Sequence, residues 1–261
     1  MASETCRGCD GAAPVTSAAP AAKTTVVLVG TGRMGTLVRA TLEAAGTYEV
    51  LGAWDVTNAG ELDCDAPAAD LVVDFSNPGS LPHVAAYVRR TGAALVSGTT
   101  GLTAEEQDTL RSLGEVAPVI WSANYSLGVA VLRRVTAEAA SALAGWDVEI
   151  VETHHNQKAD APSGTAKLLL AAVDPEGQAP VANGRAGIVG ARPAGEVGMH
   201  ALRGGTVAGT HEVHFFGVDE EVCLMHRATS RQIFVNGAVA AAGRLLAKSA
   251  GFYTFDELMF E

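Results

Sequence analysis

The sequence predicts an α/β protein, in which a doubly wound parallel sheet is followed by a C-terminal α+β domain with a mixed sheet. Three observations predict this fold class. Strand and helix patterns alternate over the first 126 residues, which is typical of parallel sheets. A G-x-G-x-x-G turn at residues 30–35 joins the first strand to the first helix. After residue 126 the alternation gives way to one long helix and several alternating strands.

The first half begins with Val26–Val29, a continuous aliphatic run of the kind that a strand buried on both faces requires. Apolar residues then recur at helical spacing, and Gly46 is expected to end that helix. Thr103 and Glu106 have the spacing of a capping box, so a helix should begin there. The remaining expected strands are 48–55, 69–76, 93–101 and 117–126, and the remaining expected helix is 80–92.

The second half should begin with a long helix at 127–145, followed by a strand at 146–155 and a helix at 163–173. Residues 174–198 have no clear period and many glycines and prolines. A loop of this length in a compact domain is usually functional or mobile. Alternating strands are expected at 199–203, 209–217 and 220–228, and a last helix at 232–251.

Composition excludes several classes of function. The 261 residues carry a net charge of −11, which argues against broad nucleic-acid binding. The sequence contains no apolar run approaching the ~18 residues of a membrane span, so no membrane partner is expected. The four cysteines favour a reducing, cytoplasmic setting. Cys6 and Cys9 form a CxxC without a second pair, so no zinc site is expected there.

Residues 1–22 consist mostly of Ala, Pro, Ser, Thr and Gly, and we expect them to form a disordered tail. The segment lacks a basic start and a Leu-rich core, so it is not a convincing signal peptide. Glu4 and Asp10 argue against an organelle transit peptide.

The glycine turn predicts a dinucleotide site of the Rossmann type. Gly30 permits the tight turn, Gly32 lets the backbone approach a pyrophosphate, and Gly35 allows close helix packing. The helix that follows would offer free N–H groups and a positive dipole to the phosphates. The expected contacts of this turn also include Thr31, Arg33 and Met34.

Asp55 ends the second strand, 20 residues after Gly35, where an acidic side chain accepts hydrogen bonds from a ribose 2′-hydroxyl. A carboxylate there repels a 2′-phosphate, so NADH is the expected cofactor. Arg33 in the glycine turn would offset part of that repulsion, so use of NADPH stays open.

Two further stretches follow the fourth and fifth strands, and ligands bind beyond the carboxyl ends of strands in such sheets. Each stretch alone is more often an ordinary turn. Together they are candidate walls of a nicotinamide site. The residues are Gly98, Thr99 and Thr100 in the first stretch, and Ser122, Ala123, Asn124 and Tyr125 in the second.

The run 152–170, "ETHHNQKADAPSGTAKLLL", carries the candidate chemistry. His154 and His155 end a strand, and Lys158 follows in the loop. Ser163, Gly164 and Thr165 should open a helix whose N–H groups suit a carboxylate. Two imidazoles, an ammonium and an anion-binding helix end fit a small dianionic substrate that receives a proton.

The same run has other interpretations. Adjacent histidines rarely chelate one ion, and no HExxH spacing appears, so no metal is expected. His154 and His155 could instead be a structural pair. Ser163 lacks the G-x-S-x-G context of a nucleophile, and a helix N-cap suffices to explain it. Asp160 is expected to fix the loop. The histidines of the later strands have no motif of their own.

The run closely resembles the E-x-H-H-x-x-K-x-D-x-P-S-G-T signature of the dihydrodipicolinate reductases, also called 4-hydroxy-tetrahydrodipicolinate reductases. "GTGRMG", "VDFSNP", "SGTTGLT", "SANYSLGV", "HALRGGTVAGTHEVHF" and "GFYTFDEL" also resemble segments of that family. The resemblance implies NAD(P)H-dependent reduction of dihydrodipicolinate to tetrahydrodipicolinate, on the diaminopimelate and lysine pathway.

The resemblance also implies residue roles and an architecture. His154 would be the general acid and Lys158 the second catalytic residue, while His155, Ser163, Gly164 and Thr165 would bind the substrate. Residues 23–126 and 236–261 would form the dinucleotide-binding domain. Residues 127–235 would bind substrate and build a homotetramer.

The sequence departs from the family pattern at two places. Many members have one more residue in the glycine turn, so the family's pyrophosphate contacts do not carry over in detail to this sequence. Many members carry an arginine where Val56 follows Asp55, which weakens the case for NADPH.

Two rival functions remain. A paralogue could reduce another cyclic imine or enamine dicarboxylate, with loop 174–198 shaping its pocket differently. A non-catalytic nucleotide-sensing protein could have kept only the dinucleotide half.

Overall fold

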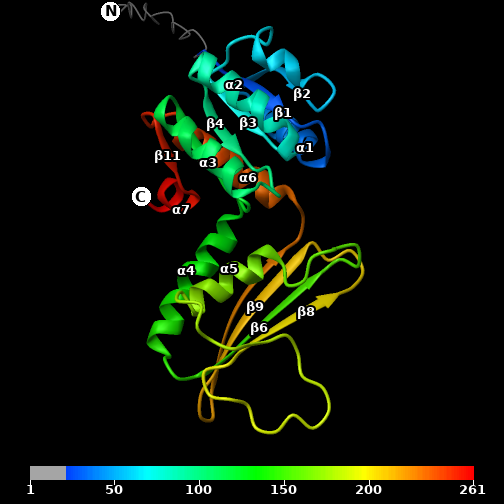
Figure 1. Cartoon of the computed structure of the whole chain (residues 1–261), viewed down its shortest axis with the longest axis vertical. Helices are drawn as coiled ribbons and strands as arrows, with labels where there is room; N and C mark the ends of the chain where they lie inside the picture. The colour runs from blue at the N-terminus through cyan, green and yellow to red at the C-terminus, as the bar shows by residue number, and fades with distance from the viewer. Residues whose placement is uncertain (1–21) are drawn as a thin grey trace, which may run out of the picture.

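The computed structural model describes residues 22–261, and the expected tail lies almost entirely outside them. Two sheets follow one another along the long axis of the molecule (Figure 1). The first is six-stranded and parallel, in the order β11-β5-β4-β3-β1-β2. The second is five-stranded and mixed, in the order β10-β9-β6-β8-β7. The predicted fold class is therefore confirmed.

The first sheet and its helices comprise the N-terminal elements and the C-terminal end of the chain. They are β1 (Thr24–Val29), α1 (Arg33–Ala45), β2 (Tyr48–Trp54), β3 (Leu71–Asp74), α2 (Leu81–Thr91), β4 (Ala94–Ser97), α3 (Ala104–Ser112), β5 (Pro118–Trp121), α6 (Gln232–Leu245), β11 (Gly251–Tyr253) and α7 (Phe255–Phe260), with short 3-10 turns at Ala59–Asp63, Pro78–Ser80 and Leu113–Glu115.

Both faces of this sheet are buried, which explains the aliphatic run of β1. Val26 and Leu28 pack on one face in a cluster that includes α1, α6 and α7, while Val27 and Val29 pack on the other face against α2 and α3. Side chains alternate along a strand, so a strand covered on both faces has no polar positions.

The helix expected at 232–251 ends earlier, at Leu245, and two short elements that were not predicted follow it. β11 pairs in parallel with β5 at the edge of the sheet, and α7 follows it. A three-residue strand is too short to show a period. The start of α7 does carry a readable signal, because Thr254 and Glu257 form a capping box there.

The second half of the structure contains the mixed sheet and two helices that cover one of its faces. Its elements are α4 (Leu127–Ala142), β6 (Asp147–His154), α5 (Gly164–Val173), β7 (Val181–Ala182), β8 (Val197–Arg203), β9 (Gly209–Phe216) and β10 (Glu221–Ala228).

One face of the mixed sheet packs on α4 and α5 around Ile150, Leu169 and Phe215, all fully buried. No helix of the described chain covers the other face, which we call the open face. It presents the alternate side chains of the strands, among them Glu149 and Thr153 of β6, His200 and Leu202 of β8, Glu212, His214 and Phe216 of β9, and Glu221, Cys223 and Met225 of β10.

The expected loop 174–198 contains the short strand β7 and ends at residue 196, because Val197 begins β8. This loop is tied to the start of β6. Arg185 and Arg192 both pair with Glu149, and Arg192 also pairs with Asp147. These ion pairs and the hydrogen bond from His200 outweigh the burial that raises the pKa of Glu149, and lower that pKa to about 2. Glu149 lies five residues before His154, about 16 Å along a strand. The anchored part of the loop is therefore remote from His154.

Candidate active site

The glycine turn is built as a close backbone approach. Gly30 has a φ of +106°, and a Cβ added there would lie 2.3 Å from the carbonyl oxygen of Phe75. A Cβ on Gly35 would lie 1.8 Å from the carbonyl oxygen of Gly30. Nothing lies within 4 Å of a Cβ placed on Gly32, so the backbone is open there. The tight turn at Gly30 and the close packing at Gly35 therefore agree with the motif, and the open backbone at Gly32 leaves its predicted approach to a pyrophosphate sterically possible.

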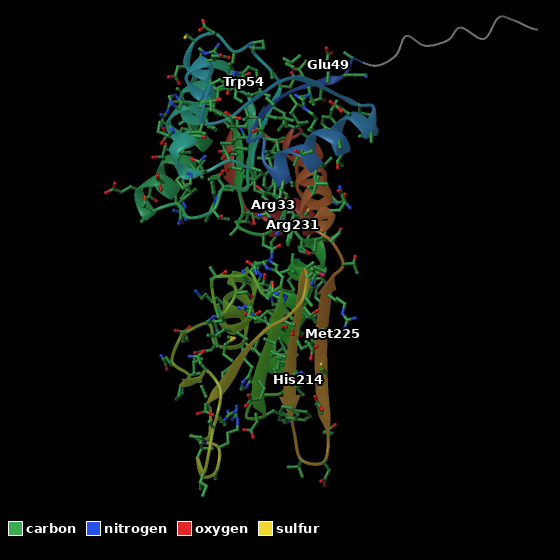
Figure 2. The ribbon with its side chains drawn as sticks, turned by 90° about the vertical axis from the view of Figure 1, so that its right-hand side faces the viewer. Arg33, Glu49, Trp54, His214, Met225 and Arg231 are labelled. Atoms are coloured by element: carbon green, nitrogen blue, oxygen red, sulfur yellow. The ribbon has the colours of Figure 1, made fainter. Side chains whose placement is uncertain are left out.

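The turn faces the second half of the molecule. Arg33, at the start of α1, and Arg231, just before α6, lie at the end of the upper half nearest the lower half (Figure 2). Glu49, at the start of β2, lies at the opposite end. Thr31, Gly32 and Arg33 are exposed, and Met34 is half-buried. The open N-terminus of α1 has no side-chain cap and no acidic residue in its first turn, so it suits a phosphate.

Asp55 lies beside the glycine turn. Its carboxylate accepts hydrogen bonds from the hydroxyl of Thr31 at 2.7 Å and from the hydroxyl of Thr57 at 2.6 Å. Hydrogen bonds from Thr57 and then from Thr31 hold the pKa of Asp55 below its usual range. Asp55 is therefore a carboxylate at neutral pH. The neighbouring Val56 is 73% exposed and adds no charge.

Asp74 organises the turns after β3 and β4. It is 1% exposed and accepts hydrogen bonds from Ser76, Ser97 and Thr99. Burial raises the pKa of Asp74 despite these bonds. The hydroxyl of Thr99 is thus engaged inside the protein, while Thr100 is exposed. Asp74 is not among the predicted site residues, although it ends a buried strand at the carboxyl edge of the sheet.

Gly98 needs to be glycine for a packing reason, because a Cβ there would lie 2.2 Å from the ring of Phe75. Because Gly98 has no side chain, the backbone of the turn packs closely against the ring of Phe75. The turn therefore offers backbone at Gly98 and an exposed side chain at Thr100.

The stretch after β5 is fixed by its own side chains. Ser122 donates its hydroxyl to the carbonyl oxygen of Asn124. Tyr125 is 1% exposed, donates its hydroxyl to the carbonyl oxygen of Ser97, and packs against Phe255. The ring of Tyr125 therefore lies in the core and offers no face to a nicotinamide, so Ser122, Ala123 and Asn124 remain as its candidate contacts.

His154 is held by a buried acid. Its Nδ1 lies 2.5 Å from Oε2 of Glu152, which is fully buried two residues earlier on β6. Arg203 on the neighbouring β8 donates to both oxygens of Glu152, at 2.9 Å and 2.8 Å. Burial raises the pKa of Glu152, but the hydrogen bonds from Arg203, His154 and Ser163 outweigh it and lower that pKa. The carboxylate therefore stays ionised and accepts the Nδ1–H of His154.

This pairing sets the direction of the other ring nitrogen. With Nδ1 bound to Glu152, Nε2 of His154 is the nitrogen that can exchange a proton with a ligand. A Cβ added to Gly209 would lie 3.1 Å from that Nε2, so the glycine leaves room beside it. Glu152 could have been found in the sequence, since residues two apart on a strand share a face.

Lys158 and His155 lie in the loop that follows. The ammonium of Lys158 lies 2.7 Å from the carboxylate of Asp160, which confirms that Asp160 makes a contact within the loop. His155 is half-buried, and its backbone N–H bonds to the carbonyl oxygen of Val207. Arg203 also donates to the carbonyl oxygen of Asp160, so one arginine supports both His154 and the Lys158 loop.

The N-terminus of α5 is capped as the sequence predicts. Ser163 accepts a hydrogen bond from the N–H of Ala166, which makes it the N-cap. The N–H groups of Gly164 and Thr165 have no carbonyl partner within the helix. Nothing lies within 4 Å of a Cβ placed on Gly164, so there is room for a carboxylate beside these groups.

His211 lies behind the cap. It is 4% exposed, its Nε2 lies 3.1 Å from the hydroxyl of Ser163, and its ring packs edge-on against His154 at 5.1 Å. Burial and then the neighbouring charge of His154 lower the pKa of His211 to about 4. His211 is therefore neutral at neutral pH, and its Nε2 shares a hydrogen bond with the hydroxyl of Ser163.

This histidine should make folding stability depend on pH. A histidine with a lowered pKa stabilises the fold above pH ~6.5 and loses that contribution as the pH falls to about 4. The loss should amount to about 3 kcal/mol of unfolding free energy. Urea unfolding of the wild type and of His211→Gln over this pH range measures the effect. The extra loss of unfolding free energy at falling pH should appear only in the wild type. Parallel plots of unfolding free energy against pH for the two proteins would contradict the prediction.

One contact joins the two groups of candidate residues. Nδ2 of Asn124, after β5, donates to Oγ1 of Thr165, in the first turn of α5, at 3.0 Å. Asn124 is held in turn, since its Oδ1 accepts the N–H of Ser126. The expected nicotinamide wall and the expected carboxylate site therefore touch.

The comparisons with known proteins all point to one family, and the similarity extends over nearly the whole of the described chain. Residues 24–125 match the family model described as dihydrodipicolinate reductase, N-terminus, and residues 128–259 match the one described as dihydrodipicolinate reductase, C-terminus. A 4-hydroxy-tetrahydrodipicolinate reductase from an Exiguobacterium species is 38% identical over 239 residues, covering 90% of this chain and 96% of the relative. One from Stenotrophomonas maltophilia is 42% identical over 194 residues, 74% of each chain.

A solved structure supports the fold. The dipicolinate-bound dihydrodipicolinate reductase from Paenisporosarcina sp. TG-14 superposes with a TM-score of 0.70 at 24% identity, covering 91% of this chain and all of that one. The two family models together account for nearly all of the described residues. The chain belongs to the dihydrodipicolinate reductase family.

Proposed function

We propose that this protein is a 4-hydroxy-tetrahydrodipicolinate reductase, which reduces dihydrodipicolinate to tetrahydrodipicolinate with NAD(P)H in diaminopimelate and lysine biosynthesis. Relatives of that name at 38% and 42% identity support the proposal. The observation that carries it is the Asn124–Thr165 contact, because it joins a candidate cofactor wall to a candidate carboxylate site.

The first half fits a dinucleotide. The open backbone at Gly32 and the uncapped N-terminus of α1 suit a pyrophosphate, and the Asp55 carboxylate suits a ribose hydroxyl. When bound, the reduced nicotinamide supplies the hydrogen and electron pair that are added to the substrate ring. Gly98, Thr100 and the stretch Ser122–Asn124 would line its ring.

The second half binds and protonates the substrate. The N–H groups of Gly164 and Thr165, with His155, would hold one carboxylate. Lys158 would leave Asp160 and stabilise the negative charge that develops in the ring. Nε2–H of His154 would donate a proton to a ring carbon, and the ring would gain one hydrogen from each source. Glu152 would support the imidazolium before the transfer.

The direct test of this function is a steady-state assay. Purified protein, NADH or NADPH, and freshly generated substrate should show loss of the near-ultraviolet absorbance of the reduced cofactor. A panel of cyclic imino acids tests the paralogue: a higher kcat/KM on another member of the panel would favour it. No turnover on any substrate would favour the nucleotide-sensing protein.

We also propose a preference for NADH, and Asp55 gives the test. Asp55→Ala should weaken NADH binding by about tenfold or more, since a hydrogen bond to a charged group contributes about 1.5–3 kcal/mol. NADPH binding should weaken less, because its 2′-phosphate is relieved of repulsion. Fluorescence titration of both cofactors measures this, with Asp63→Ala as an exposed control. Equal losses for both cofactors would show that Asp55 does not contact the ribose.

We propose residues 23–126 and 236–261 as the dinucleotide-binding domain and residues 127–235 as the substrate domain, which agrees with the return of α6, β11 and α7 to the first sheet. A homotetramer built through the open face is the proposed assembly. Leu202, Phe216 and Met225 on that face are 49%, 40% and 56% exposed, as an unpartnered apolar surface would be. Analytical ultracentrifugation tests the assembly.

None of the helices within residues 22–261 is both long and apolar enough to cross a membrane. We propose a cytoplasmic location, which suits the exposed free thiols of Cys64 and Cys223.

A further inference from the structure

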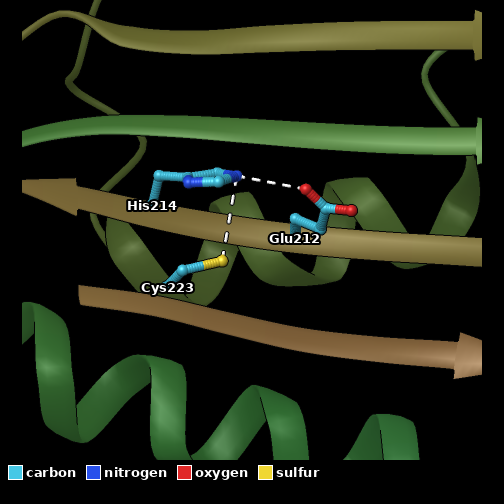
Figure 3. Close-up of side chains that lie close together, drawn as sticks. All are labelled: Glu212, His214 and Cys223. Atoms are coloured by element: carbon cyan, nitrogen blue, oxygen red, sulfur yellow. Dashed lines mark hydrogen bonds and ion pairs between the residues drawn. The ribbon is translucent and has the colours of Figure 1, made fainter. Parts of the chain in front are cut away.

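The open face carries a group of metal-ligand side chains that the proposed reaction does not use. Glu212 and His214 lie two residues apart on β9, and Cys223 of β10 is paired directly opposite His214 (Figure 3). Their donor atoms all lie within 4.8 Å of one another. The register of the β9–β10 hairpin brings the three residues together. Their spacing in the sequence does not, so they form no sequence motif.

The spacing of the donor atoms is close to that of a tetrahedral zinc site. Nε2 of His214 lies 3.2 Å from Oε2 of Glu212 and 3.9 Å from Sγ of Cys223. Metal–ligand bonds of about 2.0–2.3 Å in a tetrahedron place such donors roughly 3.3–3.7 Å apart. Small side-chain adjustments would therefore bring all three atoms onto one ion.

A second observation orients the histidine for a metal. Nδ1 of His214 lies 2.5 Å from Oε1 of Glu221, and the ring stacks on Phe216 with an interplanar angle of 6°. Histidines that bind metals almost always donate their other N–H to a carboxylate in this way. With the proton on Nδ1, the lone pair of Nε2 points toward Glu212.

The types of donor in this group suit a transition-metal ion, because imidazole, carboxylate and thiolate groups are the usual protein ligands of zinc. The thiol of Cys223 favours a metal, since a thiolate is a soft ligand for zinc and related ions.

We propose that Glu212, His214 and Cys223 bind one divalent transition-metal ion, with Zn²⁺ the expected ion and a fourth position open to solvent or a neighbouring copy. Glu221 supports the site through His214. The ion would join β9 to β10 on the open face. The sequence predicted no metal ligands, and this site is separate from the proposed active site, because His154 lies on the helix-covered face of the same sheet.

The test uses the full chain with Cys6→Ser and Cys9→Ser, so that the CxxC thiols cannot compete. Zn²⁺ titration by calorimetry should give one ion per chain and should raise the melting temperature, because the ion binds the folded state. Co²⁺ should produce a thiolate charge-transfer band in the near ultraviolet. Cys223→Ser should remove that band, and Glu221→Gln should weaken Zn²⁺ affinity about 10–100-fold.

Cys64→Ser is the matched control, since Cys64 is the other free, exposed thiol of the described residues. It should leave the cobalt band and the Zn²⁺ affinity unchanged. Retained NADH binding will show that each variant is folded. An absence of binding, a cobalt band that survives Cys223→Ser, or a band that disappears with Cys64→Ser would each overturn the proposal.

Discussion

His154→Gln should lower kcat by roughly 10²-fold or more, with little change in the affinity for NADH. The loss is the usual size for a removed acid–base group. Glutamine retains a polar side chain next to Glu152 but cannot transfer a proton from the position of Nε2. Steady-state kinetics with NADH and substrate measures the change in kcat, and fluorescence titration measures cofactor affinity.

His83→Gln is the matched control for this variant. His83 also pairs its Nδ1 with a carboxylate, that of Asp63 at 3.0 Å, but it lies on the surface of α2. It should keep wild-type turnover. An unchanged kcat in His154→Gln would remove His154 from the mechanism, whatever the control shows.

Glu152→Ala should lower both stability and turnover. Removing a fully buried carboxylate leaves Arg203 and His154 without their partner, and breaking a buried ion pair typically costs about 3–5 kcal/mol of unfolding free energy. Turnover should fall at least about tenfold, or about 1.4 kcal/mol in the barrier, because the imidazole loses its orientation. Urea unfolding and the pH profile of kcat measure the two effects separately.

Glu149→Ala is the matched control. Glu149 lies on the same strand and pairs with Arg185, Arg192 and His200, but it faces the open side of the sheet. It should lower stability without changing the pH profile of kcat. If Glu152→Ala and Glu149→Ala shift that profile equally, Glu152 has no special relation to His154.

A conservative substitution separates the effect of the Glu152 charge on His154 from the effect of a general loss of structure. Glu152→Gln keeps the side-chain shape but not the charge, so it should fold better than Glu152→Ala while still altering the pH profile. A wild-type pH profile in this variant would show that the carboxylate charge does not act on His154.

Local signals in the sequence were enough to predict most of the fold. The capping box at Thr103, the glycine at the end of α1 and the aliphatic run of β1 each act within a few residues of chain. β11 could not be predicted in this way, because its place is decided by pairing with β5, more than a hundred residues earlier.

In the candidate site, too, contacts between residues close in the sequence could be predicted, and contacts between distant residues could not. The N-cap role of Ser163 was readable because a cap bonds three residues ahead. The partnership of Glu152 with Arg203 was not, because it depends on the parallel pairing of β6 with β8. Tyr125 shows the converse limit: an aromatic residue in a stretch that is predicted to face a ligand can turn inward, here toward Phe255 and the backbone of Ser97.

The most direct test of the proposed mechanism is a crystal structure of the protein with NADH and dipicolinate, an aromatic dicarboxylate that stands in for the substrate. One carboxylate should bind the N–H groups of Gly164 and Thr165, and the ring should lie between Nε2 of His154 and the nicotinamide. A ring that faces away from His154, or carboxylates held elsewhere than at the start of α5, would contradict it.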